Sequence, residues 1–259
     1  MNKGTLGGIG IAISGIAVGL YLDGGHVGQM LQPTAALIVF GGTLGAVMVQ
    51  FPVSVVMQAA RQLKHIFAHS TDPTPHLIDA LMRYAVKARK NGLLSIDAEL
   101  NSVRDPFLRK ALTLAVDGAN APQIRQTMEL EMVRQAENED QIPRVFEAAG
   151  GFAPTIGILG AVIGLIQVMQ RLDNIDAVGK GIAVAFVATI YGVGSANIFF
   201  LPCAGRTRML MGRKQVLREM ILDGVIAIVE RTNPRMLEAN LAVYMNQTPR
   251  APAKRLVAM

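Results

Sequence analysis

Long uncharged stretches alternate with charged ones along this chain. Four runs contain no Asp, Glu, Lys or Arg, at residues 4–22, 33–60, 148–170 and 181–205. A helix needs about 20 apolar residues to cross the hydrocarbon core of a bilayer, and each run is close to or above that length. The pattern therefore predicts an all-α integral membrane protein. We place its four transmembrane helices at residues 4–22, 33–52, 148–170 and 180–203.

The polar segment between the second and third runs carries helix start and stop signals. Thr74-Pro75 is typical of an N-cap followed by proline at the first helical position, and Gly92 ends that apolar periodicity. Asp105-Pro106 repeats the start signal, and Asn120-Ala121-Pro122 opens a further, longer helix. We therefore expect a helical domain at residues 53–146.

Basic residues are spread unevenly over the polar segments. Of the 25 Lys and Arg residues, 12 lie between residues 53 and 144, and 10 follow Gly205. The loops at residues 23–32 and 171–179 hold one basic residue between them. Because Lys and Arg are enriched on the cytoplasmic side, this bias predicts cytoplasmic termini and places the two short loops on the opposite side of the membrane. The chain then crosses a membrane four times, with a helical domain (53–146) and a C-terminal helix and tail (205–259) in the cytoplasm.

Composition excludes several classes of protein. The chain is 51% hydrophobic and only 17% charged, against about 25% charged residues in a soluble domain. Cys203 is the single cysteine, so the chain forms no internal disulfide. A soluble enzyme, a disordered chain and a secreted disulfide scaffold are excluded. The net charge of +6 follows from the cytoplasmic bias and attraction to anionic lipid heads, and no motif indicates a nucleic-acid partner.

No pattern typical of catalysis is present, so we do not expect an enzyme. His65 and His69 are four residues apart but lack an obvious third ligand, and no phosphate loop or nucleophile elbow occurs. We expect neither a metal site nor a cofactor. The four runs also lack a carboxylate at membrane depth, although chains that move protons usually carry one there. If ions pass, a partner must supply the acid.

The apolar runs do contain smaller polar groups and prolines. Thr155, Thr189 and Tyr191 are candidates for an ion pathway, although a threonine hydroxyl in a helix often bonds back to its own backbone. Pro154 and Pro202 each remove a backbone donor, so each permits a hinge. Three pairs of glycines are spaced for close helix packing, within one subunit or between subunits. These pairs are Gly15/Gly19, Gly41/Gly45 and Gly160/Gly164.

A cluster of charges surrounds the predicted turn at Gly92. Lys87, Arg89 and Lys90 precede the glycine, and Asp97 and Glu99 follow it. The cluster is either a solvated helix end, whose cations favour the negative end of the helix dipole, or a surface that binds a partner.

The order of the motifs resembles the MotA/PomA family of flagellar motor stator subunits over nearly the whole chain. The third run contains Ala153-Pro154-Thr155-x-Gly157-x3-Ala161-x2-Gly164, and the fourth contains Ala188-Thr189-x-Tyr191-Gly192 with Pro202. The polar segments contribute Asp105-Pro106-Phe107-Leu108-Arg109-Lys110, Asp117-Gly118 and Asn233-Pro234-Arg235.

This resemblance implies a pentameric ring around a pair of MotB-type partners. Such a partner is a single-span, peptidoglycan-binding chain that brings one transmembrane Asp, and the rotor protein FliG receives the torque. By motif, Pro154 and Pro202 match the family's coupling prolines, and Thr189 matches its ion-path threonine. Arg89 and Asp97 match its rotor-facing pair, with Lys90 and Glu99 beside them. The acid is Asp97 where the family has the longer Glu, so Glu99 stays open as an alternative.

The resemblance also bears on the transported ion. The resemblance implies that sodium-type members carry Thr at two facing positions. The residues at these positions in this chain are Ala161 and Thr189. Because a partly dehydrated sodium ion needs oxygen ligands, Ala161 predicts proton coupling, with sodium as the alternative. An ExbB/TolQ-type motor is the competing family. Its members resemble three-span proteins, so the fourth run argues against it.

Overall fold

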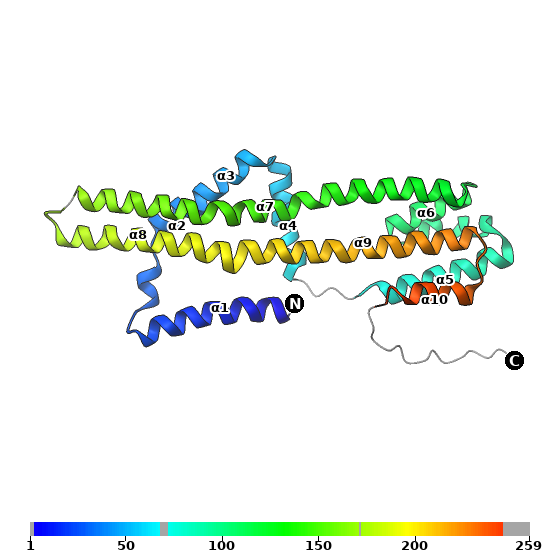
Figure 1. Ribbon diagram of the computed structural model, residues 1–259, viewed down its shortest axis with the longest axis horizontal. Coiled ribbons are helices and arrows are strands. Elements are labelled where there is room, and N and C mark those ends of the chain that lie inside the picture. Colours follow the sequence, from blue (N-terminus) through cyan, green and yellow to red (C-terminus); the bar gives the residue numbers. More distant parts are fainter. Residues whose placement is uncertain (1–2, 68–71, 171, 246–259) are drawn as a thin grey trace. The chain divides into compact units, whose positions relative to one another are not determined.

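The computed structural model describes residues 3–67, 72–170 and 172–245, and all regular elements within them are helical (Figure 1). The α-helices are α1 (Lys3–Leu22), α2 (Pro33–Ala36), α3 (Gly42–Gln50), α4 (Val53–Phe67), α5 (Thr74–Asn91), α6 (Pro106–Val116), α7 (Ala121–Met169), α8 (Ile175–Ser195), α9 (Leu201–Val229) and α10 (Pro234–Ala242). Two 3₁₀ segments, η1 (Val27–Met30) and η3 (Leu93–Ser102), and two π segments, η2 (Leu37–Gly41) and η4 (Ala196–Phe200), complete the chain.

The chain divides into two compact units. The first contains Met1–Ser70 and Glu137–Met211, and the second contains Thr71–Ala136 and Gly212–Met259. The first unit therefore holds all four uncharged runs, and the second holds most of the charged segments. The divisions fall inside α7 and α9, because the third apolar run continues the helix that opens at Ala121 and the fourth continues into α9. His69, Arg171 and the tail from residue 246 lie outside the described residues.

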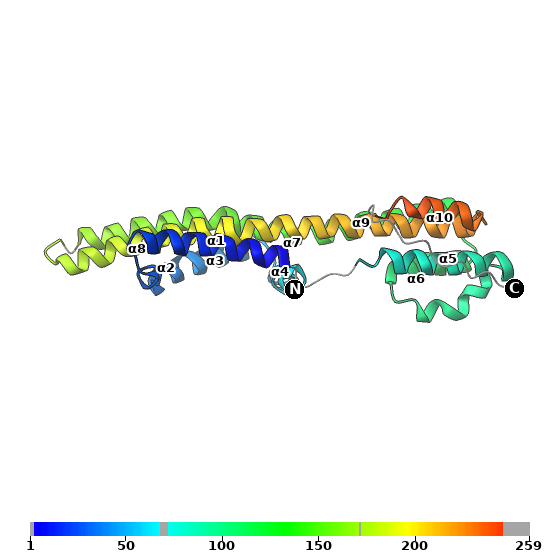
Figure 2. The ribbon, with the colours of Figure 1, turned by 90° about the horizontal axis from the view of Figure 1, so that it is seen from below.

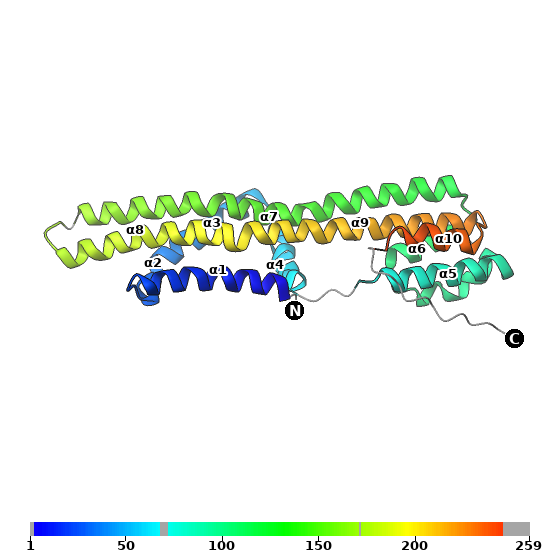
Figure 3. The same ribbon diagram turned by 60° about the horizontal axis from the view of Figure 1, so that its bottom comes forward.

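Three helices in the described part of the chain are long and apolar enough to cross a membrane. They are Pro33–Gln50, Ala121–Met169 and Val178–Val229. The remaining uncharged run forms α1, whose apolar stretch Gly7–Leu22 is shorter. Most of its large side chains are exposed, among them Ile11 and Tyr21. In Figure 3, α1 runs roughly parallel to α8.

Two of the apolar helices each contain a π segment, which is a turn with one extra residue. The first is η2, between α2 and α3, and the second is η4, between α8 and α9. Such turns occur frequently at functional positions in helices. Two residues after η2 ends, the Thr43 side chain is only 2% exposed, and its hydroxyl oxygen has no hydrogen-bond partner in the part of the chain that the structure describes. The irregular geometry is therefore accompanied by a buried, unsatisfied polar group.

The second unit packs its helices around one apolar core. Figure 2 shows α5, η3 and α6 folded back on one another. Their fully buried side chains meet those of the first part of α7, the last part of α9 and α10. The largest of these side chains are Leu81, Ile96, Leu108, Leu112, Ile124, Met128, Met220, Ile221, Leu237 and Leu241. Gly224 of α9 packs closely against Leu81, since an added Cβ would lie 2.7 Å from it.

The helix ends in this unit confirm most of the start and stop signals. Gly92 ends α5 with φ at +81°, a conformation that suits glycine. The Asp105 carboxylate accepts a hydrogen bond from the Leu108 N–H at 2.9 Å, as an N-cap should. The prediction of Thr74 as a capping residue is wrong. Its N–H donates to Asp72 at 3.0 Å and its hydroxyl donates to the same oxygen, and these bonds lower the pKa of Asp72.

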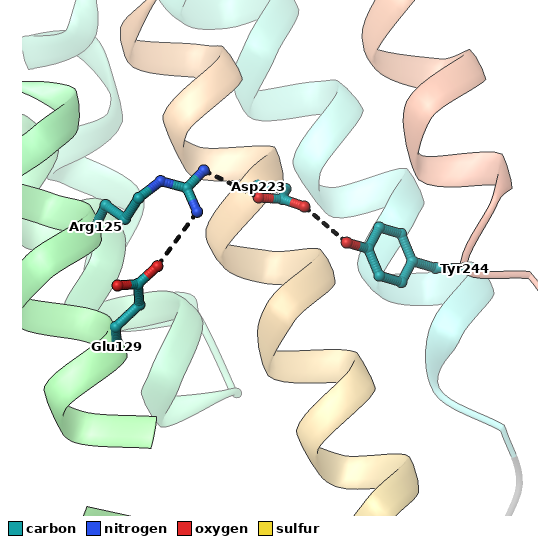
Figure 4. A network of polar contacts seen from close by, with 4 residues as sticks. All are labelled: Arg125, Glu129, Asp223 and Tyr244. Atoms are coloured by element: carbon teal, nitrogen blue, oxygen red, sulfur yellow. Dashed lines mark hydrogen bonds and ion pairs between the residues drawn. The ribbon is translucent and has the colours of Figure 1, made fainter. Parts of the chain in front are cut away.

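A polar network fixes the turn after α10 to two neighbouring helices (Figure 4). Arg125 of α7 forms ion pairs with Glu129 at 3.4 Å and with Asp223 of α9 at 3.3 Å. The Tyr244 hydroxyl donates to Asp223 at 2.7 Å. This bond, with burial and the carboxylate's charge, raises the pKa of Tyr244 to about 12. The phenol therefore stays protonated at neutral pH and keeps its hydrogen bond.

Candidate functional site

The last part of α7 and α8 run antiparallel, side by side, with their backbones in direct contact (Figure 1). A Cβ added to Gly192 would lie 2.5 Å from the carbonyl oxygen of Ala153 and 3.1 Å from the Cα of Gly157. Further along, a Cβ on Gly164 would lie 2.9 Å from the carbonyl oxygen of Gly181. Only glycine fits at these positions, so the two helices form one rigid pair.

The three glycine pairs differ in what they face. Gly160 and Gly164 face α8 within the same chain, so this pair serves packing inside one subunit. A Cβ on any of the other four would meet no atom within 4 Å. These four, Gly15, Gly19, Gly41 and Gly45, face open space outside the chain.

Ala161 and Thr189 lie at similar depth in the α7–α8 pair. Gly160 faces Ala188, since an added Cβ would lie 2.9 Å from the Ala188 Cβ, and each candidate follows one of these residues. The Thr189 hydroxyl donates to the Ala185 carbonyl at 3.3 Å, which is the backbone bond considered above. That bond uses the proton and leaves lone pairs, so the oxygen can still accept a hydrogen bond. Both residues are half-buried.

The same two residues lie on the side of the pair that faces away from α2. Gly160 packs against Ile38 of η2 and Ile156 against Gly42 of α3, and Ala161 is turned by about 140° from Ile156 around the helix. Val187 packs with Ala35 and Val39 on the α2 side, and Thr189 is two residues further, on the opposite face. The structure therefore brings Ala161 and Thr189 to one surface of the pair.

Tyr191 lies on the other face of α8 from Thr189. Its hydroxyl donates to the Met30 carbonyl of η1 and accepts a hydrogen bond from the Gln32 N–H at 3.3 Å. Its ring stacks on Phe40, with the centroids 5.9 Å apart. The structure does not bring this predicted pathway residue together with Thr189. Its contacts show that it fixes the loop before α2 to α8.

Thr155 and the two prolines lie toward the other end of the pair. The Thr155 side chain is exposed, and its hydroxyl donates to the Phe152 carbonyl at 2.8 Å. Pro154 follows Ala153, whose carbonyl oxygen is part of the tight contact with Gly192. Pro202 is the second residue of α9, directly after the π segment η4. A Cβ on Gly150 would lie 2.7 Å from Leu201, so the turns that contain the two prolines pack against each other.

The charge cluster around Gly92 separates into paired and unpaired groups. Lys87 forms an ion pair with Glu99 across the turn. Arg89, Lys90 and Asp97 are exposed and form no ion pair with another described residue. The cluster thus presents two cations and one carboxylate to solvent, while Glu99 is neutralised within the chain. Of the two acids left open by the sequence, Asp97 is the one available to a partner.

Residues that the sequence did not single out also belong to this site. Gly157 and Gly192 occur in the motifs quoted above, but only the structure shows that they set the distance between α7 and α8. No local signal marks η2, η4 or the buried Thr43. A run of apolar residues gives the same pattern whether one turn is π or α.

Comparisons with known proteins identify the class to which this site belongs. A sequence model of the MotA/TolQ/ExbB proton channel family matches residues 99–220, and a model of the motility protein A N-terminal region matches residues 6–92. Motility protein A of Bacillus subtilis is 34% identical over 246 residues, which are 95% of this chain and 91% of that protein. Chemotaxis protein PomA of Vibrio alginolyticus is 30% identical over 248 residues, covering 96% and 95% of the two chains.

Two solved structures are similar to the whole chain. A chain of the C. jejuni MotAB structure matches with a TM-score of 0.89 at 30% identity, over 96% of this chain and 98% of that one. A chain of the flagellar MotAB stator complex from Bacillus subtilis matches with a TM-score of 0.85 at 33% identity, over 93% and 95%. The fold and these matches thus identify the chain as an ion-channel subunit. The chain belongs to the motility protein A family.

Proposed function

We propose that this chain is the ion-conducting stator subunit of a bacterial flagellar motor, which couples proton flow to torque on the rotor. The observation that supports this function is the surface shared by Ala161 and Thr189 on a rigid helix pair. That surface offers a hydroxyl but no carboxylate. It therefore suits a partner that brings the acid, and the relatives include a chain of a flagellar MotAB stator complex. The partner we propose is a MotB-type, single-span, peptidoglycan-binding chain.

We propose that the chain is a bacterial inner membrane protein with four spans. Both termini then lie in the cytoplasm. Three spans meet the length and hydropathy expected of a membrane helix, and α1, with 20 residues, supplies the fourth. Basic residues concentrate in the segments that this topology places inside. We propose a homopentameric ring around two copies of the partner. The exposed apolar side chains of α1 and α7 and the open glycines of α1, η2 and α3 then contact lipid or a neighbouring subunit.

Proton coupling is the finer part of the proposal. Ala161 offers no oxygen beside Thr189, so a sodium ion would lose a ligand there, whereas a proton needs only an acid and hydrogen-bonded water. We expect swimming speed to stay constant when external sodium is varied at fixed pH and to fall to zero when a protonophore is added. A speed that rises with sodium and survives the protonophore would assign sodium instead. The matched variant is Ala161→Thr, which restores the oxygen without adding charge.

The charge cluster is the proposed contact with the rotor protein FliG. Exposed ion pairs contribute only about 0–1 kcal/mol each, so neutralising Arg89 should slow swimming rather than abolish it. Charge reversal, Arg89→Glu or Asp97→Lys, should slow it more, because repulsion replaces attraction. Glu99→Gln is the comparison variant, since Glu99 already pairs with Lys87. We expect it to have the smaller effect on swimming speed measured in soft agar and by cell tracking. Normal swimming by both reversal variants at normal expression would show that the cluster is only a solvated helix end.

An ExbB/TolQ-type motor is the second candidate, because the family model that matches residues 99–220 includes those proteins. The match of residues 6–92 to a model specific to motility protein A favours the flagellar function. Loss of swimming with intact filaments in a deletion strain distinguishes the two. An ExbB/TolQ-type motor would leave swimming unchanged.

A further inference from the structure

A cavity of about 350 Å³ lies beside α1 in the first unit. The α1 side of the cavity consists of Gly4, Gly8, Ile9 and Ala12. The opposite wall comes from Ile66 of α4 and from the π segment and the start of α9, at Asn197, Ile198, Pro202 and Cys203. All but one of these side chains are apolar. The cavity is partly open at the surface of the chain, so in a membrane it is accessible to lipid from outside.

The shape of the α1 wall favours a hydrocarbon chain. Gly4, Gly8 and Ala12 are spaced by one helical turn each, so they form a smooth stripe about 12 Å long. Gly8 does not serve close helix packing within the chain, because an added Cβ would meet no atom within 4 Å. A smooth, narrow, apolar stripe fits a flexible acyl chain better than the irregular side chains of another helix.

A cation lies one helical turn beyond the α9 residues that line the cavity. Arg206 follows Pro202 by one helical turn, so it shares the face of α9 that lines the cavity. Among the described residues its Nε is buried without a hydrogen-bond partner, and its guanidinium makes one hydrogen bond there, to the Met209 sulfur at 3.4 Å. Nearby arginines are neutralised instead, Arg208 by Glu147 and Arg144 by Asp140. Arg206 therefore keeps its full charge and most of its donors for another ligand.

We infer that this cavity binds an anionic phospholipid, with an acyl chain along the α1 stripe and the phosphate on the Arg206 guanidinium. The inference rests on the proposed topology, which places this end of the spans in the cytoplasmic leaflet. There Arg206 lies at the level of the lipid phosphates, and Lys3 precedes the stripe in the sequence. The bidentate geometry of a guanidinium suits a phosphate. The lipid would then fill the space between α1 and the hinge region at Pro202.

The test uses the full-length protein, co-purified with its partner chain in mild detergent. The complex is incubated with equal amounts of phosphatidylglycerol and phosphatidylcholine that have identical acyl chains, and native mass spectrometry counts each bound lipid. We expect about fivefold more bound phosphatidylglycerol, the factor that one cation near an anionic headgroup contributes. Arg206→Gln should remove this preference. Gly8→Leu, which fills the stripe without a backbone clash, should reduce binding of both lipids.

Matched controls separate the site from general effects. Gly7→Leu adds the same side chain beside the stripe, at a residue that does not line the cavity and whose Cβ meets no atom. Arg61→Gln removes the same charge from an exposed position on α4. Both should bind lipid like the unchanged protein. Equal lipid counts in all five proteins would overturn the inference. So would a Gly8→Leu protein that loses subunits, seen in the same spectra, while it keeps its lipid, because a second copy of the chain would then be the occupant. The number of bound lipids does not depend on motor function. The lipid measurement can therefore be interpreted even if the swimming tests contradict the proposed function.

Discussion

Gly192→Leu is expected to abolish swimming and to lower the amount of protein in the membrane, whereas Gly194→Leu is expected to do neither. The two glycines lie two residues apart on α8 but face different surroundings. A Cβ on Gly192 would lie 2.5 Å from a backbone carbonyl oxygen, that of Ala153, and a Cβ on Gly194 would meet no atom within 4 Å. A side chain can avoid a clash by changing its rotamer, but a backbone carbonyl cannot. The leucine at position 192 would therefore force α7 and α8 apart.

The loss of stability expected for Gly192→Leu follows from the free energy needed to separate α7 and α8. Overpacking a well-packed interior costs about 1–3 kcal/mol, and a contact with backbone lies at the upper end or above it. In lipid the pair also loses the close van der Waals packing on which helix association depends. Membrane abundance by immunoblot, thermal stability in detergent and swimming speed measure the outcome. If Gly192→Leu matched Gly194→Leu in all three, the close approach of α7 and α8 would be unimportant for assembly.

Pro154→Ala and Pro202→Ala are each expected to stop rotation while leaving membrane insertion and partner binding intact. A proline lacks the N–H that would bond to the carbonyl four residues earlier, so Gly150 and Ile198 lack that donor. Alanine restores the donor and closes the helical turn. Because Gly150 packs against Leu201, both substitutions stiffen the place where the two turns meet.

Three measurements are needed on the proline variants: swimming, protein level in the membrane and recovery of the partner chain on co-purification. Pro33→Ala is the control, since Pro33 is the first residue of α2, where no intrahelical donor is lost. It should swim normally. A Pro154→Ala or Pro202→Ala protein that fails to insert or loses its partner would assign these prolines to folding rather than to coupling.

Local chemistry was sufficient to predict the helical class and most helix ends. Asp105 caps α6 and Gly92 ends α5, because the capping carboxylate and the positive φ each depend on one residue and its neighbours. The misassigned cap at Thr74 shows the limit of such patterns. Asp72 and Thr74 both carry cap-forming side chains, and the local pattern does not decide which one accepts the hydrogen bond.

The rest of the site depends on contacts between distant parts of the chain. Thr189 and Tyr191 are close in sequence, but Tyr191 is committed to Met30, which is 161 residues away. The pairing of Glu99 with Lys87, which leaves Asp97 exposed, likewise depends on the path of η3 after the Gly92 turn. The π segments give no periodic signal, because one extra residue in a turn leaves an apolar run apolar.

The Tyr191 bonds to Met30 and Gln32 have a mechanical consequence. They restrict rotation of α8 about its own axis, because such a rotation would pull on the loop that leads into α2. The glycine contacts prevent α8 from sliding past α7. The helices α2, α7 and α8 therefore move as one body, and a shift imposed at Thr189 is not lost in the rotation of a single helix.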